Sequence, residues 1–138
     1  MNALLTDIQR SCFHDGPGVR TTLFFKGCIL HCPWCANPET ISSEIEYCFD
    51  SAQCVSLQGE CNLNPGCAVK KGSPLDNSVC PVNAILQFGR SYSNDELYTE
   101  IAKDIPFYGS EGGVTFSGGE PLLQLHNLIP LLSRLRAT

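Results

Sequence analysis

Residues 19–35 of this 138-residue chain, VRTTLFFKGCILHCPWC, carry the strongest indication of its fold. The first part of this stretch, residues 19–25, is rich in β-branched and aromatic residues, which is typical of a buried strand. Gly27 ends that strand, and three cysteines follow within the next eight residues: Cys28, Cys32 and Cys35. The sequence therefore predicts a strand with a tight cysteine cluster just beyond its carboxyl end.

Three thiolates at this spacing can ligate three irons of a [4Fe–4S] cluster and leave the fourth iron without a protein ligand. The chain has nine cysteines, an odd number, and a reducing cytosol disfavours disulfides. Closely spaced thiolates are therefore better interpreted as metal ligands. A structural zinc site made by the same three cysteines and His31 is the alternative, because three cysteines and one histidine form a known closed zinc ligand set.

The stretch is flanked by one further strand and by an irregular segment. Residues 3–13 mix apolar and polar residues as a short strand does, and Asp15-Gly16-Pro17-Gly18 predicts a turn. From about 40 to 90 the periodicity disappears over a length that exceeds an ordinary loop. We interpret residues 40–90 as an inserted subdomain, and residues 1–39 and 91–138 as the main domain.

The second part of the main domain alternates helix and strand. Ser93-Asn94-Asp95-Glu96 forms a capping box, which predicts a helix over residues 94–105. Residues 112–117 indicate a second short strand, and the Leu-rich stretch to Arg136 is expected to be helical, with Pro130 near its first turn. This order of elements predicts an α/β fold with a parallel sheet.

Composition excludes several classes of protein. Apolar residues make up 43% and charged ones 17%, which indicates a folded module rather than a disordered one. The net charge of −5 argues against a nucleic-acid partner. Apolar runs are far shorter than the roughly 20 residues of a membrane span, and the first residues lack a secretion signal. We expect a cytoplasmic protein that does not enter a membrane.

Three motifs together carry a family resemblance: Asp15-Gly16-Pro17-Gly18-Val19-Arg20, the loop CILHCPWCANPE at residues 28–39, and GGVTFSGGEP at residues 112–121. In this order they resemble the radical S-adenosylmethionine (SAM) superfamily, and more narrowly the activating enzymes of glycyl radical enzymes, relatives of the pyruvate formate-lyase activating enzyme. The resemblance implies the N-terminal part of a (β/α) radical SAM barrel with an inserted ferredoxin-like Cys-rich subdomain.

The resemblance also implies the chemistry. A [4Fe–4S] cluster on Cys28, Cys32 and Cys35 chelates SAM and cleaves it reductively, and the resulting radical abstracts hydrogen from a glycine of a partner enzyme. A flavodoxin or ferredoxin is the family's usual electron donor, and pyruvate formate-lyase, dehydratases, choline lyase and aryl decarboxylases are among the family's partners. The residues implied to bind SAM are Trp34, Cys35, Ala36, Gly118, Gly119 and Glu120.

Elementary chemistry agrees with the last of these assignments. Two glycines allow close backbone approach to a charged amino-acid ligand, and Glu120 can accept hydrogen bonds from its ammonium group. Taken alone, however, Gly118-Gly119-Glu120-Pro121 is equally typical of a strand-to-helix turn with proline in the first helical position.

A second group of five cysteines lies in the insertion: Cys48, Cys54, Cys61, Cys67 and Cys80. Cys80-Pro81 resembles the end of bacterial ferredoxin motifs, although their compact portion is missing. Because relatives carry auxiliary clusters here, we expect one auxiliary [4Fe–4S] cluster on Cys54, Cys61, Cys67 and Cys80, with Cys48 spare. The alternatives are an insertion without a cluster and one that binds zinc.

Single residues outside these groups receive simpler interpretations. Cys12 is expected to be a small buried hydrophobic residue, and His14 and His126 are expected on the surface. Arg20 contacts either the SAM site or the partner's glycine loop, or it is a charged residue at a strand edge.

The chain is shorter than a full barrel, which takes about 250 residues. The family's later Asp-x-Lys motif does not occur before Thr138, so we interpret the chain as truncated. Uncovered strand edges and apolar helix faces then predict association with another segment or marginal stability. Two alternatives to an activating enzyme follow: an iron–sulfur electron-transfer module without SAM chemistry of its own, and a structural zinc protein.

Overall fold

The computed structural model is a mixed α/β chain, and it describes residues 2–55, 67 and 80–137. Contacts divide the chain into two compact units. The sheet unit joins Met1–Glu44 to Gly89–Thr138, and the hairpin unit is Ile45–Phe88. The predicted α/β class is confirmed, whereas the barrel and the ferredoxin-like nature of the insertion stay predictions.

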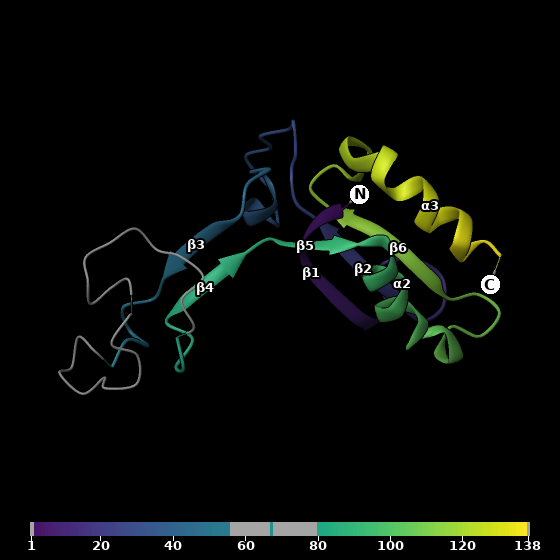
Figure 1. Cartoon of the computed structure of the whole chain (residues 1–138), viewed down its shortest axis with the longest axis horizontal. Helices are drawn as coiled ribbons and strands as arrows, with labels where there is room; N and C mark the ends of the chain where they lie inside the picture. Colours follow the sequence, from purple (N-terminus) through teal and green to yellow (C-terminus); the bar gives the residue numbers. More distant parts are fainter. Residues whose placement is uncertain (1, 56–66, 68–79, 138) are drawn as a thin grey trace. The chain divides into compact units, whose positions relative to one another are not determined.

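Four strands in the order β5-β1-β2-β6 form the sheet unit's sheet (Figure 1). They are β1 (Asn2–Cys12), β2 (Arg20–Phe25), β5 (Arg90–Ser93) and β6 (Gly113–Gly118). Strands β2 and β6 are parallel, as the order of elements predicts, whereas β1 runs antiparallel to both β2 and β5. The sequence analysis did not predict β5, because four residues without clear alternation carry no strand signal of their own. It also did not predict that β1 pairs antiparallel with its neighbours.

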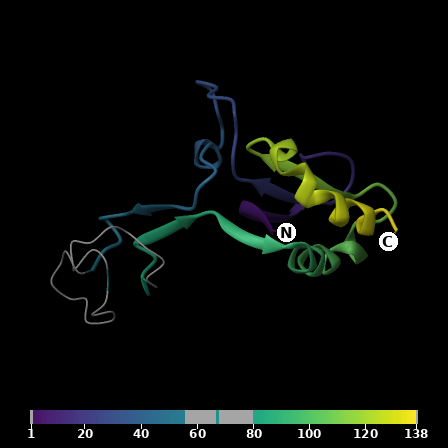
Figure 2. The same cartoon turned by 45° about the horizontal axis from the view of Figure 1, so that its top comes forward.

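Two helices, α2 (Asn94–Ala102) and α3 (Leu125–Leu135), pack side by side against this sheet (Figures 1 and 2). Asn94 Nδ2 joins them by donating a hydrogen bond of 2.9 Å to the carbonyl oxygen of Asn127. No helix in the described part of the chain is long and apolar enough to cross a membrane. Burial of apolar area from both layers stabilises the unit. The buried core consists of Ala3, Leu5, Leu23, Phe25, Leu97, Ile101, Leu128 and Leu131.

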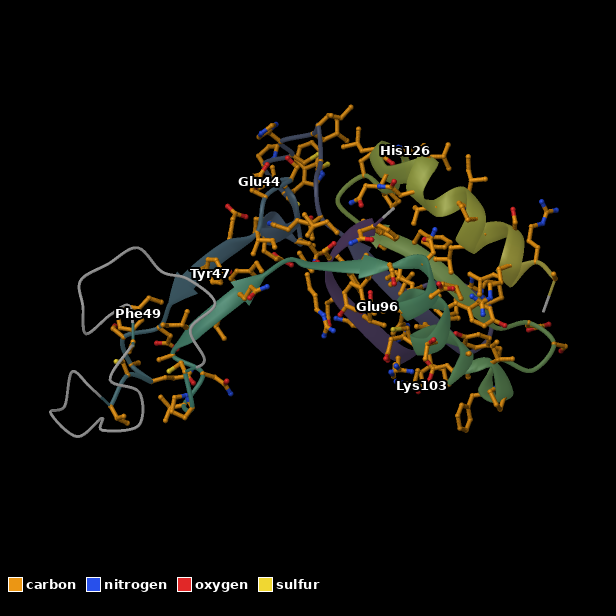
Figure 3. The ribbon with its side chains drawn as sticks, viewed as in Figure 1. Glu44, Tyr47, Phe49, Glu96, Lys103 and His126 are labelled. Atoms are coloured by element: carbon orange, nitrogen blue, oxygen red, sulfur yellow. The ribbon has the colours of Figure 1, made fainter. Side chains whose placement is uncertain are left out.

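The predicted capping box begins α2. The Ser93 N–H donates to Glu96 Oε2 at 2.7 Å, and the Glu96 N–H donates to Ser93 Oγ at 3.2 Å. Glu96 and Lys103 lie at the two ends of this helix (Figure 3). The helix ends at Ala102, three residues before the predicted end, because Pro106 has no N–H to donate to the Ala102 carbonyl oxygen, and the chain continues as the 3-10 helix η2 (Ile105–Phe107).

The C-terminal helix corrects the prediction for Pro130. The chain first forms a 3-10 turn, η3 (Pro121–Gln124), and α3 begins at Leu125. Pro121, rather than Pro130, takes the first position of the turn, where a missing N–H costs little. Pro130 lies inside α3 with its side chain exposed, and the helix tolerates the loss of one intrahelical hydrogen bond there.

The hairpin unit contains a two-stranded antiparallel sheet that the sequence analysis missed. Its strands are β3 (Glu46–Phe49), which carries Tyr47 and Phe49, and β4 (Ile85–Phe88) (Figure 3). Cys48 lies opposite Leu86. The two strands are 35 residues apart in sequence, so no local turn signal links them.

Strand β6 lies at one edge of the four-stranded sheet. An open groove of about 370 Å³ runs beside it between β6, α3 and the segment before β6. Apolar side chains of Val114, Phe116, Leu132 and Leu135 line much of the groove. The association of this edge with another segment or chain stays a prediction.

Candidate metal centre

The parallel pairing of β2 and β6 brings two of the predicted motifs together. Parallel strands end at the same edge of a sheet, and Phe25 lies opposite Gly118. We call residues 28–39, which follow β2, the cysteine loop. Just beyond the strands, the Gly119 N–H donates to the Phe25 carbonyl oxygen and the Glu120 N–H donates to the Gly27 carbonyl oxygen, both at 2.8 Å. Gly118–Glu120 is thus hydrogen-bonded to the residue that precedes the cysteine loop.

The two glycines of this segment are required by backbone packing. Gly118 has a φ of +91°, and a Cβ atom there would lie 2.6 Å from the Phe25 backbone nitrogen. A Cβ atom on Gly119 would collide with the carbonyl oxygen of Gly27 and would lie 2.9 Å from that of Thr40. The sequence analysis assigned both glycines to close approach of a ligand. In the structure, the close approach is to the chain's own backbone.

Hydrogen bonds hold the two ends of the cysteine loop beside each other. The Gly27 N–H donates to the carbonyl oxygen of Thr40 at 2.7 Å, and the Cys28 N–H donates to that of Ile41 at 2.9 Å. Thr40 ends the short 3-10 helix η1 (Pro38–Thr40), and its buried hydroxyl donates to the carbonyl oxygen of Asn37 at 2.6 Å. These hydrogen bonds therefore fix the backbone at both ends of the cysteine loop.

The three cysteines lie on this one loop, with Cys28 at its base and Cys32 and Cys35 in its middle. Cys28 and Cys32 are half-buried, and Cys35 is exposed. The Cys35 N–H donates to the Cys32 carbonyl oxygen at 3.0 Å, and the Leu30 N–H donates to Cys28 Sγ at 3.4 Å. In the described part of the chain, no three His, Cys, Asp or Glu side chains converge closely enough to hold a metal ion.

The donor chemistry nevertheless fits an iron–sulfur cluster. Soft thiolates select Fe–S clusters or zinc, and three thiolates leave one iron of a cubane cluster open. His31, the fourth ligand of the alternative zinc site, is exposed on the same loop. The loop also carries exposed Ile29 and Leu30, so its middle is not packed into the core.

The other residues predicted to bind SAM are accessible. The Trp34 side chain is 82% exposed, and Ala36 is exposed as well. One carboxylate oxygen of Glu120 accepts a hydrogen bond of 2.9 Å from the Leu122 N–H and so caps η3. A carboxylate has about four acceptor positions, so Glu120 keeps acceptor capacity for an ammonium group.

The cysteines of the hairpin unit differ in their surroundings. Cys54 and Cys67 are buried, Cys80 is half-buried, Cys48 is exposed on β3, and Cys61 lies outside the described residues. Burial by itself raises the pKa of the Cys80 thiol, but hydrogen bonds from four backbone N–H groups lower this pKa, on balance, below its ordinary value of 9.0. The four groups belong to Val82, Ala84, Ile85 and Asn83. Such hydrogen bonds stabilise the thiolate, which is the metal-binding form.

Arg20 lies at the amino end of β2, opposite the end that carries the cysteine loop. Its Nε donates to Thr115 Oγ1 at 2.5 Å, and Nη2 donates to the Val114 carbonyl oxygen at 2.8 Å. Its Nη1 also donates to the carbonyl oxygen of Pro17 at 3.2 Å. The guanidinium group therefore ties the turn at residues 15–18 to β6.

The remaining single residues give a mixed result. His14 and His126 are exposed, as predicted. Cys12, predicted to be buried, is only half-buried, because it ends β1 next to a left-handed residue, Ser11 (φ 57°), and its Sγ lies 3.6 Å from the Gln9 carbonyl oxygen.

Sequence reasoning missed two residues beside the cysteine loop. Gln124 of η3 donates to the carbonyl oxygens of Leu4 and Lys26 at 3.0 and 2.8 Å, and it accepts from the Leu4 N–H at 2.8 Å. No pattern in the sequence indicates this role. Lys26 is 1% exposed. The sequence feature that could have identified it is a charged residue at the end of an apolar strand, directly before Gly27 and Cys28.

Comparisons with known proteins identify the family of the chain. A family model described as "4Fe-4S single cluster domain" matches residues 14–138. The pyruvate formate-lyase 2-activating enzyme of Escherichia coli (strain K12) is 43% identical over 135 residues, which cover 97% of this chain and 42% of the relative. The trans-4-hydroxy-L-proline dehydratase activating enzyme of Clostridioides difficile is 39% identical over 90% of this chain and 46% of its own length.

A third relative, the 4-hydroxyphenylacetate decarboxylase activating enzyme of Clostridium scatologenes, is 35% identical over 95% of this chain and 48% of the relative. This chain thus spans less than half the length of each of the three. The family match and the relatives support the predicted cofactors, a [4Fe–4S] cluster and SAM. They also confirm the resemblance to activating enzymes on which the sequence analysis rested. The chain belongs to the 4Fe-4S single cluster domain family, among relatives that are activating enzymes.

Proposed function

We propose that this chain is the cluster- and SAM-binding part of an activating enzyme that cleaves SAM reductively and generates a glycyl radical on a partner enzyme. One observation carries the proposal. The hydrogen bonds from Gly119 and Glu120 to the end of β2 join the proposed SAM segment to the base of the cysteine loop. Cofactor and cluster would then share one site at the carboxyl ends of two parallel strands, where barrel enzymes build their sites.

Each group of residues has a separate task in this proposal. Cys28, Cys32 and Cys35 would hold the cluster, which supplies one electron and an open iron position when bound. The backbone at residues 34–36 would lie against the adenine ring, and Gly118–Glu120 would hold the methionine part. The Glu120 carboxylate would accept hydrogen bonds from the ammonium group, and a charge-assisted bond of this kind is about twice as strong as a neutral one.

The partner and the electron donor belong to the same proposal. The substrate would be a glycyl radical enzyme, and the reductant a flavodoxin or ferredoxin. The three relatives are named for a pyruvate formate-lyase, a dehydratase and a decarboxylase, so their names leave open which glycyl radical enzyme this chain would serve. We place the protein in the cytoplasm, where free thiols stay reduced.

Electron paramagnetic resonance tests this function directly. The chain is reconstituted anaerobically with iron and sulfide, reduced, and measured with and without SAM. We expect a cluster signal that changes when SAM is added, because SAM would bind the open iron. A cluster signal that SAM does not change would contradict the proposal and leave an iron–sulfur electron-transfer module.

The variant Glu120→Gln sharpens this test. Glutamine keeps an oxygen that can accept from the Leu122 N–H, so η3 stays capped, but the negative charge is lost. We expect an unchanged cluster signal and a SAM concentration for half-maximal change that is about tenfold or more higher. Glu111→Gln, at an exposed residue before β6, is the matched control. Equal SAM dependence in the two variants would remove Glu120 from the SAM site.

We also propose that Cys54, Cys61, Cys67 and Cys80 hold one auxiliary [4Fe–4S] cluster in a ferredoxin-like subdomain over residues 40–90. The backbone N–H groups around the Cys80 sulfur support this, because hydrogen bonds to sulfur tune iron–sulfur clusters.

Iron counting tests the auxiliary cluster. We expect two clusters per reconstituted chain, and one cluster in Cys80→Ala, because a cubane cluster needs four ligands from this unit. Cys48→Ala replaces the exposed cysteine and should keep both clusters. A wild-type chain that never exceeds one cluster of iron would contradict the auxiliary site.

A further inference from the structure

Lys26 is a lysine in an unusual environment. It follows β2 directly and is only 1% exposed, whereas lysine is almost never fully buried unless its ammonium group is paired. Its Nζ donates a hydrogen bond of 2.5 Å to the carbonyl oxygen of Glu39. Both residues belong to the sheet unit, and the bond spans 13 positions of the sequence.

This hydrogen bond connects the two ends of the cysteine loop through a buried side chain. Lys26 lies two residues before Cys28, and Glu39 lies four residues after Cys35. The two backbone hydrogen bonds at the base of the loop join Gly27 to Thr40 and Cys28 to Ile41. The lysine adds a third connection between the two ends of the loop, made by a buried side chain.

The backbone of Lys26 is itself held firmly. Its N–H donates to the Leu4 carbonyl oxygen at 2.9 Å, and its own carbonyl oxygen accepts from Gln124 Nε2 at 2.8 Å. The lysine side chain therefore extends from a backbone position fixed by the sheet to Glu39, at the end of the loop. An apolar residue of the same length would pack equally well but would leave the Glu39 carbonyl oxygen without this donor.

We infer that Lys26 is a positioning residue that closes the cysteine loop and places a positive charge at the end of the loop, beside the Glu39 carbonyl oxygen. The inference rests on the proposed cluster at Cys28, Cys32 and Cys35. A reduced [4Fe–4S] cluster together with its three thiolates would carry a net negative charge, and net charge and buried surroundings help to set a cluster's reduction potential. A cation in a site of low dielectric constant stabilises the reduced state, and so it raises the potential.

The first test compares reduction potentials. Lys26→Met removes the donor and the charge, Lys26→Arg keeps both, and Lys103→Met makes the same chemical change at an exposed lysine at the end of α2 (Figure 3). Each chain is reconstituted, its iron is counted, and the cluster is titrated with a graded reductant. We expect a lower midpoint potential in Lys26→Met, and potentials near wild type in Lys26→Arg and Lys103→Met. Equal potentials in all four chains would overturn the inference about charge.

A second test does not depend on the cluster. Amide hydrogen exchange of the cluster-free chain reports how firmly the loop is held. We expect exchange at residues 28–41 to be about tenfold faster in Lys26→Met than in wild type or Lys103→Met, because one hydrogen bond that closes the loop is lost. Unchanged exchange would overturn the positioning role.

The two tests separate the two proposals. If the wild-type chain takes up no cluster, the proposed function fails, and hydrogen exchange alone decides whether Lys26 closes the loop. If Lys26→Met does not fold, Lys26→Gln takes its place in both measurements, because glutamine has no charge and its side chain is one atom too short to keep the bond to the Glu39 carbonyl oxygen.

Discussion

Replacing Gly119 by alanine is expected to destabilise the sheet unit by about 2–4 kcal/mol. The added Cβ atom would collide with the Gly27 carbonyl oxygen and would lie 2.9 Å from that of Thr40. Both oxygens belong to backbone that is already hydrogen-bonded, so neither can move aside cheaply. Relief would require separation of Glu120 from Gly27, which breaks the connection between the proposed SAM segment and the cysteine loop. Chemical denaturation of the cluster-free chain measures the loss.

Gly109→Ala is the matched control for this experiment. Gly109 has a φ of +58°, but no atom lies within 4 Å of a Cβ built there. Its replacement carries only the cost of a left-handed conformation, about 1–2 kcal/mol. Equal losses of stability in the two variants would show that the close approach at Gly119 does not constrain the fold.

Single alanine replacements of Cys28, Cys32 and Cys35 are each expected to remove one whole cluster of iron from the reconstituted chain. Three thiolates are already one fewer than a cubane cluster usually has, so the loss of any one leaves too few ligands. The SAM-dependent change in the paramagnetic signal should disappear in all three variants. Iron analysis and the spectrum of the reduced protein provide the two readouts.

Two further variants distinguish this result from its alternatives. Cys12→Ala, at the end of β1, should keep all the iron, because this half-buried cysteine lies outside the loop. His31→Ala should also keep it, because the proposed cluster uses no histidine. Zinc without iron in the wild-type chain, lost again in His31→Ala, would instead identify a structural zinc site.

Predictions of single elements succeeded where the signal was local. The capping box at Ser93 and Glu96 located the start of α2 to the residue, because both partners lie within one turn. The apolar and β-branched residues of β2 and β6 located those strands within one residue at each end. Pro130 was misplaced because the entry into α3 depends on η3, which the Glu120 carboxylate caps. A leucine-rich pattern does not distinguish a 3-10 turn from the first turn of an α-helix.

The order of elements along the chain predicted one of the strand pairs. The β2–α2–β6 order predicts a parallel pair, and this pair is present. The β1–β2 pair is local, because only seven residues, including the turn at residues 15–18, separate the two strands, and the sequence analysis did not draw the pairing from that turn. The β1–β5 pair and the β3–β4 sheet join segments far apart in sequence, and no adjacent turn indicates those pairings. Strands of four residues also have too few positions to show a period.

The residue pattern was enough to identify the family and to name candidate ligands: three cysteines close together, two glycines and a glutamate after a strand, and their order along the chain. Residue type and spacing are local properties, and ligand chemistry depends on them directly. The three-dimensional structure was needed to show that Gly118 and Gly119 pack against the chain's own backbone, that Arg20 is hydrogen-bonded to β6, and that Lys26 joins the two ends of the cysteine loop. These facts depend on which segments become neighbours once β2 and β6 pair, and a linear pattern does not contain distances between residues far apart in the chain.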